Sequence, residues 1–191
     1  AMSINPGVDV AWTLDHAFDD GRYLSSPPVT TPLGTIVVAM TSADQFTSSD
    51  IFRRTAGGWQ APFSITPGGG IGGLGITQIT SHPTGGPAGV PCLVAFLADF
   101  NTISQAWVSN DDGVTWALEF DFVASWGSIP FQDFAAPGVI TSNAAFGTTA
   151  MYWPIWDASY GGQGYLAVRT GPGVWVQREI ANAVGTAISG I

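Results

Sequence analysis

One stretch of the chain combines aromatic rings with a carboxylate in the way that sugar-binding sites do. Trp126, Trp153, Trp156 and Tyr160 occur in the same third of the chain as Asp157. An aromatic ring can stack on the apolar C–H face of a neutral sugar, while a carboxylate accepts hydrogen bonds from the hydroxyl groups. The same rings could instead fill a core between packed elements, and the residue types leave this alternative open. These five residues are candidate ligand-binding residues.

Two further aspartates occupy positions like that of Asp157. Asp44, Asp99 and Asp157 each follow an apolar run within a few residues. A carboxylate that recurs at one position of a repeat could provide one ligand contact per unit, or it could form a turn. Both interpretations stay open, so Asp44 and Asp99 join the candidate ligand-binding residues.

The element that could position such residues is best defined at residues 109–116, with the sequence Ser-Asn-Asp-Asp-Gly-Val-Thr-Trp. Polar and apolar residues alternate on both sides of it, which predicts two antiparallel strands joined by a tight turn. Asp111 can accept hydrogen bonds from backbone N–H groups two or three residues on, and Gly113 can adopt a positive φ. Trp116 can then fold its indole back over the base of the hairpin.

The spacing Ser-x-Asp-x-Gly-x-x-Trp resembles the Asp-box, the hairpin signature of the BNR repeats in sialidase-type β-propellers and related sugar-processing or sugar-binding proteins. The match is complete over eight residues, one hairpin of a 191-residue chain. The resemblance implies a propeller blade. In the enzymes of that family the Asp-box lies far from the active site, so the motif adds little to a case for catalysis.

The residues that sialidase catalysis would require are mostly missing. The resemblance implies three arginines on the substrate carboxylate, a tyrosine assisted by a glutamate, and an aspartate as acid/base. The chain has five arginines, but residues 52–55 are a poor substitute for the Phe-Arg-Ile-Pro motif. Its two glutamates, Glu119 and Glu179, fall in the strand that is usually outermost in a blade. We expect no catalytic residues, and a degenerate glycoside hydrolase is the least favoured hypothesis.

Tryptophan also ends two other turns. Trp59 and Trp175 lie 116 − 59 = 57 and 175 − 116 = 59 residues from the central tryptophan, and both turns keep glycine but lack the Ser and Asp. They resemble degenerate copies of the central turn. With the recurring apolar runs, they predict all-β, propeller-like units of four antiparallel strands at about 24–66, 67–125 and 126–181. The tryptophans at the repeated position are interpreted as packing residues (Trp12, Trp59, Trp116 and Trp175).

Both ends of the chain resemble isolated strands. Residues 9–18 mirror the strand that starts at Trp116, and residues 186–191 resemble the first strand of a unit. Three units do not close a ring, because closed propellers have about four to eight blades, and folded proteins avoid open sheet edges. We expect one propeller-like domain over residues 1–191, either assembled as a homo-oligomer or part of a longer repeat protein.

Charge and composition argue against several classes of binding partner. The net charge of −9 comes from 14 carboxylates against 5 cations, which argues against nucleic acid and anionic membranes as partners. The single Cys92 has apolar neighbours and is predicted to be buried. His16 and His82 are isolated, and residues 110–113 lack the ligand spacing of a calcium loop, so we expect no metal and no cofactor.

The sequence therefore favours a non-catalytic carbohydrate-binding, lectin-like module with a glycan as its partner. Such a module could be the receptor-binding part of a larger surface or viral fibre assembly, which favours an extracellular or virion-surface location while leaving the localisation open. The alternative is a structural domain whose unpaired strands mediate oligomerisation.

Overall fold

The computed structural model describes residues 22–41, 48–66, 75–82, 92–98, 104–126, 140–143, 148–157 and 163–179. Most of them lie in antiparallel β-strands, and the only described helix is α1 (Phe122–Trp126). The predicted all-β class is confirmed. Among these residues no helix is long and apolar enough to cross a membrane.

The first sheet has four strand positions although six strands contribute to it. Both β1 and β2 pair with β3, and both β5 and β6 pair with β4, so two edge positions are interrupted. The strands are β1 (Tyr23–Leu24), β2 (Val29–Thr30), β3 (Ile36–Thr41), β4 (Ser49–Thr55), β5 (Gly58–Trp59) and β6 (Phe63–Ile65).

The second and third sheets have four strands each. The second has the order β10-β9-β8-β7 and the third the order β11-β12-β13-β14, with all neighbours antiparallel. The second sheet consists of β7 (Gly75–His82), β8 (Cys92–Ala98), β9 (Ser104–Ser109) and β10 (Ala117–Asp121). The third consists of β11 (Ile140–Asn143), β12 (Thr148–Asp157), β13 (Gln163–Gly171) and β14 (Val174–Glu179).

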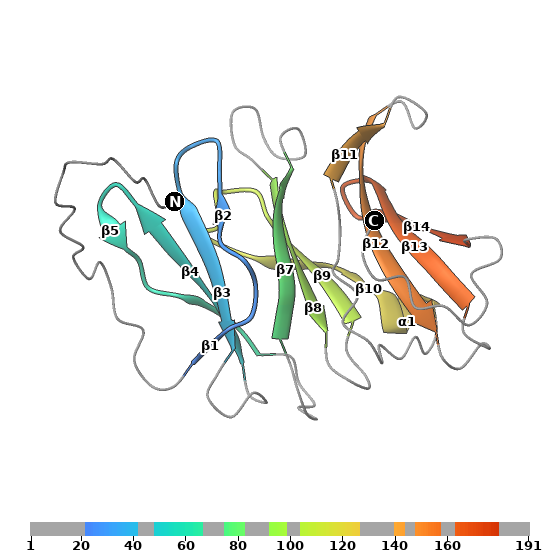
Figure 1. Cartoon of the computed structure of the whole chain (residues 1–191), viewed down its shortest axis with the longest axis horizontal. Coiled ribbons are helices and arrows are strands. Elements are labelled where there is room, and N and C mark those ends of the chain that lie inside the picture. The colour runs from blue at the N-terminus through green and yellow to red at the C-terminus, as the bar shows by residue number, and fades with distance from the viewer. Residues whose placement is uncertain are drawn as a thin grey trace, which may run out of the picture.

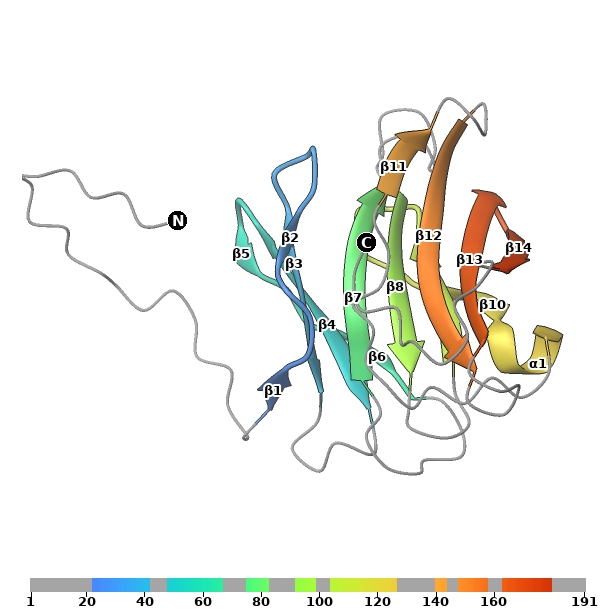
Figure 2. The same ribbon diagram turned by 45° about the vertical axis from the view of Figure 1, so that its right-hand side comes forward.

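The three sheets stand side by side in chain order, as Figures 1 and 2 show from two directions. The blue and cyan first sheet and the orange and red third sheet flank the green second sheet. The second sheet is therefore covered on both faces. One of its two inner strands, β8, is apolar throughout, which is typical of a strand buried on both sides.

Alternation along β8 divides its side chains between two cores. Leu93, Ala95 and Leu97 face the first sheet, whereas Cys92, Val94 and Phe96 face the third. The first core also contains Val37, Ala39, Ile51, Ile65, Ile79 and Trp116. The second core also contains Ala106, Phe122, Ala167 and Trp175.

A third cluster lies on the face of the first sheet that points away from the second. Val38, Met40 and Phe52 are buried there, with Ile36 and Trp59 packed against them. We call this set the outer-face cluster. The alternation along β3 explains it, because Val37 and Ala39 point into the first core while Val38 and Met40 point the other way.

The described strands form three separate sheets at residues 23–65, 75–121 and 140–179. No strand pairing among them closes a ring. The predicted isolated strands at 9–18 and 186–191 lie outside the described residues. The helix α1 has five residues, too few for a helical period to be visible in the sequence. Asp121 caps this helix by accepting a hydrogen bond from the amide of Ala124 at 2.8 Å.

Candidate functional site

The turn between β9 and β10 is held by the carboxylate of Asp111. The Thr115 amide donates to the two Asp111 oxygens at 2.9 and 3.1 Å, and the Thr115 hydroxyl donates at 2.6 Å. Ser109 Oγ donates to Asp111 Oδ1 at 2.7 Å and accepts from the Gly113 amide at 2.8 Å. The predicted hairpin is confirmed, but the amide bound by Asp111 lies four residues on rather than two or three.

Positive φ angles explain why Asp111 binds an amide four residues further along the chain. Asp112 has a φ of 59° and Gly113 a φ of 82°, so two successive residues are left-handed. Trp116 closes the turn as predicted: its indole Nε1–H donates to the Gly113 carbonyl at 3.2 Å, and the ring is buried in the first core. The turn is thus fastened at its tip by Asp111 and at its base by Trp116.

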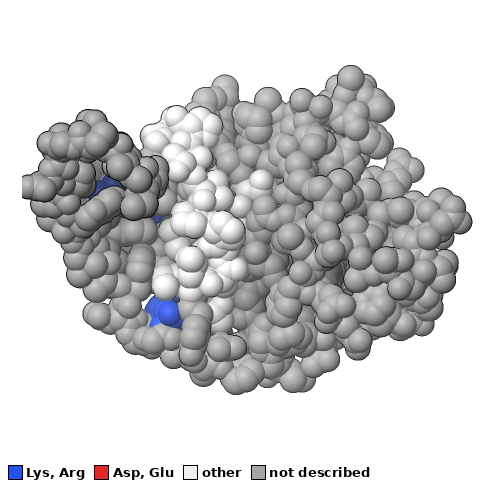
Figure 3. Space-filling model, in the orientation of Figure 1, with Lys and Arg blue, Asp and Glu red and all other residues white. Residues whose placement is uncertain are grey.

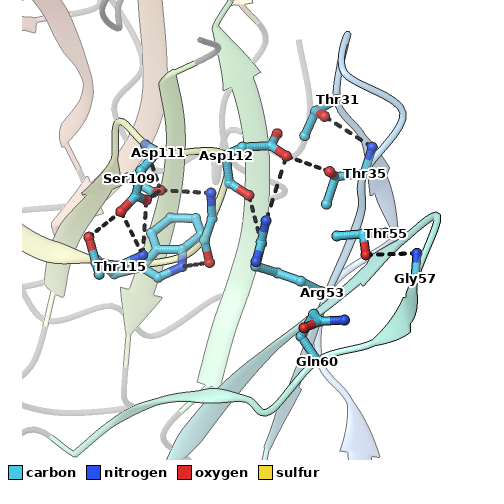
Figure 4. Close-up of polar contacts among 12 residues, drawn as sticks. Thr31, Thr35, Arg53, Thr55, Gly57, Gln60, Ser109, Asp111, Asp112 and Thr115 are labelled. Atoms are coloured by element: carbon cyan, nitrogen blue, oxygen red, sulfur yellow. Dashed lines mark hydrogen bonds and ion pairs between the residues drawn. The ribbon is translucent and has the colours of Figure 1, made fainter.

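Asp112 connects the same turn to the first sheet. Arg53 Nε donates to the Asp112 carbonyl at 2.8 Å, and a terminal nitrogen of Arg53 lies 3.7 Å from Asp112 Oδ2. The Thr35 hydroxyl donates to the same carboxylate oxygen. Figure 4 shows Asp112 between its own turn and these two residues of the first sheet. The two neighbouring aspartates of the turn therefore have different roles: Asp111 binds groups within the turn, and Asp112 connects the turn to the first sheet.

The turn between β13 and β14 is held by a carboxylate from the second sheet. Glu119 of β10 accepts two hydrogen bonds from Arg169, at 2.8 Å from Nε and 2.6 Å from a terminal nitrogen. It also accepts from the Gly173 amide and from the Trp175 indole, both at 3.0 Å. The side chains of Glu119 and Arg169 are only 7% and 4% exposed. We call this set of four residues the Glu119 latch.

The surroundings of these carboxylates favour their charged forms. Burial opposes ionisation of Glu119, but the hydrogen bonds and charge of Arg169 and the N–H groups of Gly173 and Trp175 outweigh it, so its pKa is lowered. The pKa of Asp111 is also lowered, because the hydrogen bonds from Thr115 and Ser109 outweigh its desolvation. Both carboxylates are therefore anions with their acceptor sites in use.

An aromatic cluster lies beside the Glu119 latch. The ring of Trp175 meets Phe122 at a centroid distance of 5.1 Å and Phe96 at 5.9 Å, both edge-on. Trp126, a predicted ligand-binding residue, packs against Phe122 at 5.1 Å and Phe120 at 5.3 Å and is partly buried. These contacts match the packing alternative that the sequence left open for Trp126.

The other predicted site residues are placed only in part. Trp153, Trp156 and Asp157 lie in β12, where they pair with Ala167, Gly164 and Gln163 of β13. Asp44, Asp99 and Tyr160 lie outside the described residues.

The Glu119 latch was missed in the sequence, although a signal for it exists. The third turn has lost the Ser and Asp of the central turn but carries an arginine, Arg169, before its glycine and tryptophan. A turn that loses its own carboxylate and retains a cation can be served by an anion from a neighbouring element. Glu119 is one of only two glutamates in the chain.

The described groups fit structural roles better than catalytic ones. A carboxylate held by four donated hydrogen bonds and shielded from water is poorly suited to exchange a proton with a substrate. Cys92 is buried, and this burial raises the pKa of its thiol, which disfavours a nucleophilic thiolate. Within the described ranges no cluster of three or more His, Cys, Asp or Glu residues could hold a metal ion.

Comparison of the chain with protein-family models, with curated proteins and with solved structures gives no match in any of the three. The function must therefore be inferred from the residues and their geometry.

Proposed function

We propose that the chain is a non-catalytic carbohydrate-binding, lectin-like module, with the three sheets acting as consecutive blades of a propeller-like repeat. The observation that carries the proposal is the Glu119 latch. It engages Glu119 and Arg169, residue types that a sialidase-type site would need, in a buried ion pair between two sheets. Recognition through aromatic rings then remains as the chemistry that the sequence favours.

Two other described arginines support the same conclusion. Arg53 is committed to Asp112, and Arg22 forms an ion pair with Asp50. A substrate carboxylate would have to compete with these protein carboxylates for the guanidinium groups, at the cost of leaving buried anions unpaired. A neutral sugar makes no such demand, because it binds through ring stacking and hydroxyl hydrogen bonds.

The ligand site that we propose lies along β12. Trp153, Trp156 and Asp157 all lie in this strand. Trp156 pairs with Gly164 of β13, a cross-strand neighbour without a side chain. We therefore assign the stacking role to Trp156.

A glycan array with purified protein tests this assignment. We expect binding of the wild type to at least one neutral glycan, loss of that binding in Trp156→Ala, and retention in Trp153→Ala. Val174→Ala is the matched control, because Val174 is an exposed apolar residue of the same sheet. An array without any bound glycan, or equal binding by Trp156→Ala and the control, would refute the proposal.

Unfolding in urea separates recognition from packing. Trp116→Ala should lower the free energy of unfolding by about 3–5 kcal/mol, because it removes a buried indole from the first core. Trp156→Ala should change it by less than about 1 kcal/mol if the ring serves a ligand rather than the core. Equal losses in the two variants would show that the tryptophans were assigned to the wrong roles.

The second candidate function is a structural domain that assembles through its flanking sheets. It is favoured by the arrangement of the described sheets, in which the second is covered on both faces and no strand pairing closes a ring. Light scattering of the purified chain tests assembly. A strict monomer at all concentrations would exclude a ring built from several chains.

A further inference from the structure

One tryptophan of the second sheet takes no part in the repeated turns. Trp107 lies in β9, where its side chain packs against the first core but stays partly exposed. Trp116 and Trp175, in contrast, are only 5% and 6% exposed. Trp126 packs on two phenylalanine rings. Trp107 differs from these three because its side chain contacts a core and is also accessible from outside.

A chain of hydrogen bonds extends from the indole of Trp107. Its Nε1–H donates to Gln105 Oε1 at 3.0 Å, and Gln105 Nε2–H donates to Asp121 Oδ2, also at 3.0 Å. The other carboxylate oxygen of Asp121 accepts from the amide of Ala124 at 2.8 Å. An indole N–H can only donate, so its partner on Gln105 must be the carbonyl oxygen, and this fixes the orientation of the amide group.

A β-bulge in β10 brings a leucine to the same face. Leu118 pairs with Trp107, and Asp121 pairs with Gln105. Direct cross-strand partners share a face, and so do residues two apart in one strand, so all four side chains lie on the same face of the second sheet. We call these four residues the Trp107 platform. Leu118 and Asp121 are three apart and would point to opposite faces in a regular strand, but the register shifts between them.

The same bulge directs Glu119 to the opposite face. The register shift falls between Leu118 and Phe120, at the position of Glu119. The Glu119 carboxylate reaches Arg169 of the third sheet, whereas Leu118 lies on the face of Trp107, which packs against the first core. Bulges commonly re-aim side chains beside binding sites. In β10 the bulge serves both the Glu119 latch on one face and the Trp107 platform on the other.

The platform presents apolar surface to the solvent. Leu118 is 46% exposed, and the side chains of Gln105, Trp107 and Asp121 are each partly exposed. A leucine and an indole that are neighbours across two strands form one continuous apolar surface. Such a surface suits the C–H face of a sugar ring.

Hydrogen-bonding capacity remains beside this apolar surface. The Gln105 amide has two N–H groups and donates one of them to Asp121, and each oxygen of Asp121 accepts one hydrogen bond. Among the described residues, one N–H of Gln105 and a lone pair on each Asp121 oxygen therefore remain for a ligand. Two adjacent hydroxyl groups of a sugar would meet a donor at Gln105 and an acceptor at Asp121.

The charges around the platform favour a neutral ligand. Asp121 is its only charged member. Arg169, the arginine that contacts β10, binds Glu119 on the opposite face of the sheet. The basic atoms in view in Figure 3 lie on the side of the molecule that the first sheet occupies. An anionic sugar would thus meet the like charge of Asp121 without a compensating cation in the platform.

We propose that the Trp107 platform is a binding site for a neutral sugar with adjacent hydroxyl groups. Trp107 and Leu118 contact the C–H face of the sugar, Gln105 donates to one hydroxyl group, and Asp121 accepts from the next. The inference rests on the proposed carbohydrate binding, and it adds a site on the second sheet to the one assigned to Trp156.

NMR of the ¹⁵N-labelled full-length chain tests the proposal through the indole N–H resonances. The probes are cellotriose, maltotriose and chitotriose, three neutral sugars, each at about 20 mM, enough to fill a site with a Kd of about 1 mM. Trp107→Phe and Trp156→Phe identify the two resonances. We expect at least one of these sugars to shift the Trp107 resonance.

The pattern of shifts separates this inference from the proposed function. A shift of the Trp156 resonance alone would overturn the platform and leave the carbohydrate-binding function standing. A shift of the Trp107 resonance alone would support the platform and remove the site at Trp156. No shift of either resonance with any of the three sugars would overturn both.

The two polar residues are tested by the Kd of the sugar that shifts Trp107. Gln105→Ala should raise this Kd about tenfold, because it removes the donor. Gln60→Ala, at an exposed glutamine beside β5, is the matched control and should leave the Kd within about twofold. Asp121→Ser should also raise the Kd, while its hydroxyl oxygen keeps an acceptor for the Ala124 amide at the start of α1. The same Kd in Gln105→Ala and Gln60→Ala would overturn the proposal.

The apolar contact is tested at a position where folding is little affected. Leu118→Ala should raise the Kd about threefold, because it removes apolar surface that the sugar covers. The urea midpoint should stay close to that of the wild type, since Leu118 is exposed. Leu24→Ala, at a leucine of the first sheet that is 59% exposed, is the control. An equal Kd in the two alanine variants would contradict contact between the sugar and Leu118.

Discussion

The turns that end at Trp116 and Trp175 use carboxylates from different places for the same task. In the second sheet, Asp111 binds the backbone of its own turn, and the indole of Trp116 donates to a carbonyl within that turn. In the third sheet, Glu119 arrives from β10 of the neighbouring sheet and accepts from both the turn backbone and the indole of Trp175. The first turn depends on local sequence, whereas the second depends on how two sheets pack.

The difference makes the second sheet the source of the charged contacts at both interfaces. It supplies Asp112 to Arg53 of the first sheet and Glu119 to Arg169 of the third. A turn that has lost its own carboxylate can persist if a neighbour provides one, but its stability is then coupled to that neighbour. Removing each carboxylate in turn tests whether the two turns differ in this way.

The largest effect is expected at Glu119. Glu119→Leu leaves the buried Arg169 guanidinium without its partner, and this should lower the free energy of unfolding by about 3–5 kcal/mol. Urea unfolding followed by tryptophan fluorescence measures the loss. The single substitution should destabilise the third sheet first, because Gly173 and Trp175 also lose their acceptor.

A double variant shows whether the unpaired charge is the cause. Glu119→Leu with Arg169→Met replaces both charged groups by apolar side chains, so it should recover most of the loss seen in Glu119→Leu alone. Equal destabilisation by the single and the double variant would mean that the charge pair is not what holds the two sheets together at this point.

A smaller effect is expected from acid. The pKa of Glu119 is lowered in the folded state, so the unfolded chain binds more protons as the pH falls toward and below about 4.3, the ordinary value for glutamate. The stability from the Glu119 latch is fully present above that pH and is lost as the pH falls through the folded pKa. Urea midpoints measured between pH 7 and pH 3 should therefore decrease toward acid.

The acid dependence also distinguishes the two turns. Glu119→Gln should flatten the pH profile of the urea midpoint more than Asp111→Asn does, because Glu119 is buried whereas the Asp111 contacts to Thr115 are exposed. A greater flattening by Asp111→Asn would show that the local turn, not the contact between sheets, carries the acid sensitivity.

The sequence predicted the elements whose signals are local. Alternation of polar and apolar residues around Trp116 marked β9 and β10, and the turn residues Asp111 and Gly113 marked their connection. The repeated tryptophans at 59 and 175 located two further hairpins, in β4–β5 and β13–β14. Each of these signals lies within about ten residues, so a single sequence suffices to read it.

Contacts between sheets could not be predicted in the same way. Glu119 and Arg169 are 50 residues apart, and Arg53 and Asp112 are 59 apart. Neither pair has a spacing rule, because their proximity follows from how the sheets stack. Trp126 illustrates the same limit: the sequence left both a ligand surface and core packing open, and the contacts of its ring with Phe120 and Phe122 follow from the fold.

The smallest effect separates the two turns at their glycines. Gly113 and Gly173 have φ angles of 82° and 69°, so alanine costs about 1–2 kcal/mol at either position from backbone conformation alone. At Gly113 the new Cβ would also lie 3.3 Å from Arg53 Cδ and from Leu93 Cδ1, whereas at Gly173 it meets no atom within 4 Å. Gly113→Ala should therefore lower the urea midpoint further than Gly173→Ala. When both variants are made in an Arg53→Ala background, the difference between their midpoints should be smaller, because the shorter side chain makes room at Gly113. Equal midpoints for the two alanine variants would mean that the side chains around Gly113 move aside freely, and that the contact between Arg53 and Asp112 is not rigid.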